Sequence, residues 1–122
     1  MEPIALRDKK GNRKMLPEQS HAVLLDFHRR MVNRRVPVVR MILFGSSARG
    51  DADESSDLDV LVVVDRKDPA ILESIEQSAW EAEFGPGALI QPVVMTRDEM
   101  TRSPKRHSLL LQAVEKEGIR VA

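Results

Sequence analysis

The hydrophobic positions of this chain follow helical spacing in some segments and extended runs in others. Between residues 17 and 35 the spacing predicts a helix with one apolar face, formed by Val23, Leu24, Phe27 and Met31. Two short apolar runs follow, residues 38–44 and 58–64, and the second is rich in valine, as expected of buried strands.

The second half of the chain also alternates between segments with helical spacing and extended apolar runs. Asp68 and Pro69 resemble an N-cap and a first helical residue, and they predict a helix to about Phe84. We expect its inner face to carry Leu72, Ile75, Ala79 and, in the core beside them, Trp80.

A third strand is predicted at residues 88–95, and Pro92 favours an edge position or a bulge because proline cannot donate a ladder hydrogen bond. A last helix is expected to open at Ser103-Pro104 and to close at Gly118. The pattern therefore predicts an α/β (α+β) fold, with a small mixed β-sheet flanked by helices. Residues 1–16 form either an arm or a hairpin, and residues 17–122 form a single domain.

Composition narrows the class of protein. The chain has 122 residues, enough for one small domain with a modest core. Nineteen basic and nineteen acidic residues balance, so net charge does not indicate nucleic acid, although local basic clusters leave it open. The chain contains no cysteine and no stretch long enough to span a membrane, and its first residues lack a signal-peptide pattern. We therefore expect a cytoplasmic protein without a thiol mechanism.

Candidate chemistry gathers between the first two predicted strands. The first strand ends at Gly45, and Ser46 and Ser47 then offer hydroxyl and N–H groups suited to an anion. Asp57 and Asp59 open the second strand, where alternation places both carboxylates on one face, roughly 6–7 Å apart. Paired carboxylates repel unless a cation lies between them, and Mg²⁺ is commonly shared with substrate phosphates. This pattern indicates magnesium-dependent chemistry on a nucleoside triphosphate.

The residues Gly45-Ser46-Ser47-Ala48-Arg49-Gly50 and Ser56-Asp57-Leu58-Asp59 resemble the G-S-x-A-R-G and S-D-x-D signature of minimal nucleotidyltransferases. That family belongs to the DNA polymerase β-like superfamily, so the resemblance implies a polymerase-β-like palm. It also implies that Gly45, Ser46 and Ser47 hold the triphosphate, that Asp57 and Asp59 ligate Mg²⁺ as catalytic residues, and that Arg49 supports the turn or the phosphates. The tail at residues 109–119 resembles the closing helix of these proteins.

The sequence departs from the family pattern at one position. Active members carry a third carboxylate on a later strand, whereas residues 88–95 contain no acid and Gln91 is expected at that place. An amide can ligate a metal through its oxygen, but it lacks the charge and cannot act as a base. Asp65 is a poor substitute, because it lies about 20 Å along the strand from Asp59.

Two functions remain open from the sequence. The first is an enzyme that moves a nucleoside monophosphate from a triphosphate, with ATP the first expectation, to a hydroxyl acceptor. The resemblance makes a helical partner protein of the HEPN type a plausible acceptor, as in antitoxins. The alternative is an inactive module with this fold that binds nucleotide or a partner protein.

Other mechanisms fit the sequence less well. The turn lacks the Gly-Lys-Ser/Thr ending of a P-loop and the closing glycine of a nucleophile elbow. The chain also lacks the His pair or Cys cluster of a zinc site.

Overall fold

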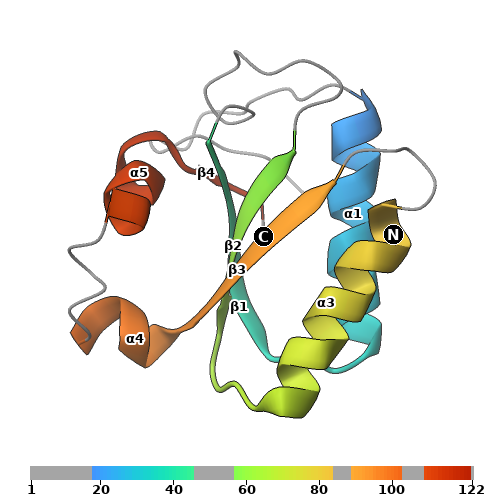
Figure 1. Ribbon diagram of the computed structural model, residues 1–122, viewed down its shortest axis with the longest axis horizontal. Helices are drawn as coiled ribbons and strands as arrows, with labels where there is room; N and C mark the ends of the chain where they lie inside the picture. The colour runs from blue at the N-terminus through green and yellow to red at the C-terminus, as the bar shows by residue number, and fades with distance from the viewer. Residues whose placement is uncertain (1–17, 46–56, 84–88, 103–108, 122) are drawn as a thin grey trace.

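The computed structural model describes residues 18–45, 57–83, 89–102 and 109–121 (Figure 1). The first two helices and first three strands match the segments predicted from hydrophobic spacing. In chain order the elements are α1 (Glu18–Asn33), β1 (Val38–Phe44), β2 (Leu58–Val64), α3 (Pro69–Glu83), β3 (Ile90–Thr96), α4 (Arg97–Arg102), α5 (Leu109–Glu117) and β4 (Ile119–Arg120).

The strands form one mixed sheet in the order β3-β2-β1-β4. β1 pairs antiparallel with both β2 and β4, whereas β2 and β3 run parallel and are joined through α3. The end of β1 and the beginnings of β2 and β3 therefore meet at one end of the sheet. The prediction of a small mixed sheet is confirmed, and Pro92 lies on an edge strand as expected.

Helices cover both faces of the sheet (Figure 1). α1 and α3 pack on one face, over a large cluster that includes the predicted helix residues Val23, Leu24, Phe27 and Met31, each fully buried. α4 and α5 lie on the other face, over a smaller cluster formed by Phe44, Leu61, Val63, Met95, Leu111 and Val114. Because β2 is covered on both faces, its residues from Val60 to Val64 are all buried.

Local signals explain where the helices begin. The Asp68 carboxylate accepts a hydrogen bond from the backbone N–H of Ile71 at 2.8 Å, which confirms the predicted N-cap of α3. At the start of α4, Thr96 and Glu99 accept hydrogen bonds from each other's backbone N–H groups, each at 3.1 Å, and so form a capping box.

The inner face of α3 differs from the prediction. Ile75 and Ala79 are buried as expected, but Leu72 is 36% exposed and Trp80 is 59% exposed. The buried stripe instead runs through Ile71, Ile75, Ser78, Ala79 and Ala82. The placement of Trp80 in the core was therefore wrong, because its position lies about 100° around the helix from Ala79.

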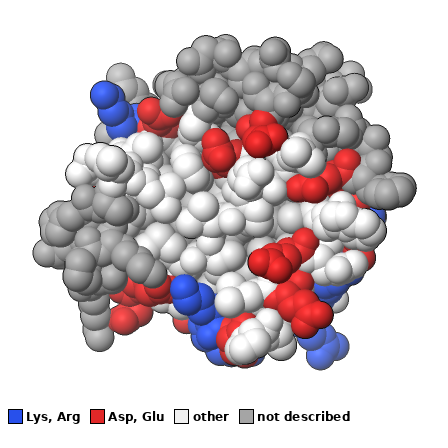
Figure 2. Space-filling view, in the orientation of Figure 1, with Lys and Arg blue, Asp and Glu red and all other residues white. Residues whose placement is uncertain are grey.

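The surface view adds one feature of the sheet edge. Figure 2, which looks toward β3, shows a broad uncharged area with several acidic side chains along part of its border. β3 itself contains no charged residue.

Within the residues that the model describes, no helix is long and apolar enough to cross a membrane.

Candidate functional site at the shared end of β1, β2 and β3

The turn after β1 is built around Gly45. Its φ of 78° lies in the left-handed region, which side-chain-bearing residues rarely adopt. A Cβ at this position would overlap Oδ2 of Asp59. The sequence therefore needs glycine here for two reasons, the backbone conformation and the close approach of a carboxylate.

The two predicted carboxylates lie at the beginning of β2. Asp57 immediately precedes the strand and is exposed, whereas Asp59 lies within it and is half-buried. Asp59 is opposite Phe44 in the antiparallel pairing with β1. Because Phe44 and the alternate β2 residues Leu61 and Val63 belong to the smaller cluster, Asp59 is on the face covered by α5.

Gln91 lies beside this pair. In the parallel ladder it is opposite Asp59, and its amide Nε2 donates a hydrogen bond to Oδ2 of Asp57 at 3.3 Å. The amide is thus next to both carboxylates, at the place where the family resemblance implied a third acid. Among the described residues, no group of three or more His, Cys, Asp or Glu side chains could hold a metal ion.

The donor set at this end of the sheet suits a hard divalent cation. Asp57, just before β2, and Asp59, within it, supply carboxylate oxygens from alternate positions, and oxygen is the ligand atom that Mg²⁺ prefers. Gln91 adds an amide whose oxygen would face the carboxylates after a half-turn of the amide group. This set carries two negative charges, one fewer than a site with three acids.

Several predicted site residues lie outside the described part of the chain. These are Ser46, Ser47 and Arg49 of the predicted turn. Two other predicted segments, the arm or hairpin at residues 1–16 and the helix start at Ser103-Pro104, also lie outside the described residues. Their predicted roles stay predictions. Asp65, by contrast, follows the far end of β2 and pairs with Arg97, the Nε and Oδ1 atoms being 3.0 Å apart.

A comparison with family models matches residues 25–121 to the nucleotidyltransferase domain. The match extends from α1 to β4 and includes every described residue of the site. The chain belongs to the nucleotidyltransferase domain family. The resemblance to minimal, polymerase β-like nucleotidyltransferases that was inferred from the glycine-serine turn and the paired acids is confirmed.

Two further comparisons were made with this nucleotidyltransferase domain, one against solved structures and one against curated proteins. A solved structure from Sulfolobus solfataricus, described as that of a "putative nucleotidyltransferase", is similar to it with 18% sequence identity and a TM-score of 0.43. The alignment covers 69% of this chain and 75% of that chain. No curated protein matches the sequence.

Proposed function

We propose that this nucleotidyltransferase domain transfers a nucleoside monophosphate from a nucleoside triphosphate to a hydroxyl acceptor, with Mg²⁺ at Asp57 and Asp59. In this reaction the acceptor oxygen forms a bond to the α-phosphorus. The bond from that phosphorus to the bridging oxygen breaks, pyrophosphate leaves, and the hydroxyl proton passes to solvent or to a base on the acceptor.

The observation that carries this proposal is the contact between Gly45 and Asp59. A carboxylate lies directly against a glycine in the left-handed region, and in the sequence this glycine comes immediately before the two serines of the predicted turn. Phosphates held by that turn would lie near the carboxylates, because β1 and β2 are adjacent strands whose residues Phe44 and Asp59 are opposite each other.

Each residue then has a definite task. Asp57 and Asp59 would hold the cation, which when bound supplies positive charge to the phosphate oxygens and the leaving pyrophosphate. Gly45 leaves room for ligand and carboxylate at the turn, and Gln91 orients Asp57 through its hydrogen bond. Since Gln91 cannot accept the proton of the acceptor, transfer by this chain would depend mainly on positioning and charge.

Titration calorimetry tests the nucleotide site. We expect ATP, GTP, CTP or UTP to bind only with Mg²⁺, and Asp59→Asn to weaken that binding by at least about tenfold. Asp65→Asn is the matched control, since it removes the same charge at the other end of β2 and should leave binding unchanged. Equal affinities for wild type and Asp59→Asn would refute the assignment.

A second function rests on Gln91 itself. A neutral amide hydrogen-bonded to Asp57, where active relatives are expected to carry an acid, favours a module that binds nucleotide without transferring it. Gln91→Asp separates the two functions. If the wild type transfers label from α-³²P-ATP and Asp59→Asn abolishes transfer, the enzyme is supported. If only Gln91→Asp transfers, the natural chain is a binding module.

The acceptor is proposed from the family resemblance. We infer that the acceptor is a protein hydroxyl on a helical partner of the HEPN type, that this domain acts as the antitoxin of that partner, and that ATP is the donor. Labelled ATP incubated with both proteins should mark the partner chain. Two results would contradict this acceptor: label found on this chain instead of on the partner, or no label on either protein although the nucleotide binds.

A further inference from the structure

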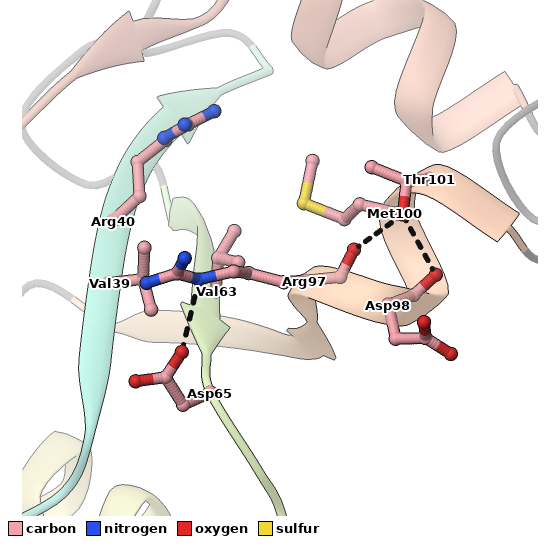
Figure 3. A pocket seen from close by; sticks show the side chains of 8 residues that line it. All are labelled: Val39, Arg40, Val63, Asp65, Arg97, Asp98, Met100 and Thr101. Carbon is pink, nitrogen blue, oxygen red and sulfur yellow. Dashed lines mark hydrogen bonds and ion pairs between the residues drawn. The ribbon is translucent and has the colours of Figure 1, made fainter.

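A pocket lies at the other end of the sheet from the carboxylates. It has a volume of about 580 Å³ and opens on the face that α4 and α5 cover (Figure 3). Its lining combines the apolar side chains Val39, Val63 and Met100 with the polar side chains Arg40, Asp65, Arg97, Asp98 and Thr101. A pocket of this size is large enough for a small organic molecule, and its lining offers both apolar side chains and charged groups to such a ligand.

A β-bulge positions the two β1 residues of this pocket. Val38 is opposite Val64 and Arg40 is opposite Val63, so Val39 is an extra residue in β1. In a regular strand, Val39 and Arg40 would point to opposite faces of the sheet. Here both line the same pocket, because the bulge turns consecutive side chains toward one face. The irregularity therefore places Arg40 and the apolar Val39 together in the lining of one pocket.

Of the two arginines that line the pocket, Arg97 is paired with Asp65, whereas Arg40 is available to bind an anion. No described residue forms a hydrogen bond or ion pair with its guanidinium. Asp65 is already paired with Arg97, whose side chain crosses the pocket, and the Asp98 carboxylate points away from both arginines (Figure 3). The Asp65–Arg97 pair is weakly held, since its side chains are 59% and 64% exposed, so Arg97 can also turn toward an anion.

We propose that this pocket binds a small organic anion, with one carboxylate or phosphate group on Arg40 and Arg97 and an apolar body on Val39, Val63 and Met100. Guanidinium groups bind both kinds of anion through paired N–H donors. The site is separate from the triphosphate site, because Asp65 lies about 20 Å along β2 from Asp59. The proposal therefore stands whether or not the chain transfers nucleotides.

The experiment uses the full chain labelled with ¹³C in its methionine methyl groups. Met100 lines the pocket, whereas Met41 is buried on the opposite face of β1 and serves as an internal reference. Phenyl phosphate, phenylacetate and the neutral 2-phenylethanol are the probes. We expect both anions to shift the Met100 resonance, assigned with Met100→Leu, and the alcohol to require at least about tenfold higher concentration.

Arginine variants decide whether the proposed cation is responsible. Arg40→Gln should weaken anion binding about tenfold or more, while Arg66→Gln, an exposed arginine outside the pocket, should not change it. The preference for phosphate or carboxylate identifies which anion the pocket favours. The proposal is wrong if the alcohol binds as well as the anions, if both arginine variants behave alike, or if Asp59→Asn abolishes probe binding.

Discussion

At the scale of single residues, the site depends on one unusual contact. Gly45 combines a left-handed backbone with an Asp59 oxygen in the place where a Cβ would lie. Either property alone excludes most side chains. Because the Asp59 carboxylate lies against Gly45, a change at one of these two residues is expected to affect the position of the other. Gln91 extends this coupling to the third strand through its bond to Asp57.

A double-mutant cycle tests the contact. Gly45→Ala should destabilise the fold by about 1–2 kcal/mol from its positive φ alone, with a further cost from the overlap with Asp59. In an Asp59→Ala background the overlap with the carboxyl group is absent, so the same substitution should cost less. Urea denaturation of the four proteins measures the coupling, and equal costs in both backgrounds would show that the carboxylate does not press on this position.

At the scale of elements, α1 and α3 are joined by a network of ion pairs. Arg34 donates to both Glu81 oxygens at 2.7 and 2.8 Å, Arg30 donates to one of them at 2.9 Å, and Gln77 adds a bond from within α3. Arg34 also donates to Ser78, the buried hydroxyl of the helix interface. The hydrogen bond from Arg34, which has the largest effect, and the hydrogen bond from Gln77 lower the pKa of Glu81 to about 2.

The lowered pKa gives this network a definite pH dependence. Since the unfolded pKa is near 4.5, the stability from Glu81 is present above that value and is lost as pH falls toward about 2. Glu81→Gln should therefore be destabilised relative to wild type at pH 7, and the difference should shrink below pH 4.5. Urea midpoints from pH 7 to 2.5 measure this effect. Glu76→Gln, on the exposed side of α3, is the control and should show a smaller difference.

At the scale of the whole molecule, the two faces of the sheet carry unequal clusters. The α1–α3 face holds most of the fully buried side chains, whereas the α4–α5 face holds fewer and includes both the proposed anion pocket and Asp59. We infer that the first face provides most of the folding free energy. The second face has less apolar burial and more of the polar groups with proposed functions.

Core substitutions on each face should differ in cost. Phe27→Ala removes a fully buried ring between α1 and the sheet and should cost about 3–5 kcal/mol. Leu111→Ala lies in the smaller cluster and is 7% exposed, so we expect a loss near the lower end of the range for such changes, about 2 kcal/mol. Circular dichroism in urea suits both variants, because the only tryptophan, Trp80, is largely exposed. A larger loss for Leu111→Ala would reverse this ranking.

The amino-acid sequence by itself determined the local features of this protein. Hydrophobic spacing predicted α1, β1, β2 and α3 closely, because amphipathic periods, caps and turn residues act over a few residues. The sequence also identified Gly45 as a turn residue and Asp57 and Asp59 as paired acids, because these features depend on residues that are close together in the chain. The two-residue strand β4 lacked any such signal and was missed, because pairing with β1 defines it.

Only the tertiary structure decided which distant residues meet. Strand order and register place Gln91 beside Asp59, and a bulge in β1 turns Arg40 into a pocket with α4 residues. The rotation of α3 on the sheet likewise exposes Trp80, although its hydrophobicity favoured the core. Pairing, bulges and helix rotation depend on contacts between segments far apart in the chain, so no short sequence window contains them.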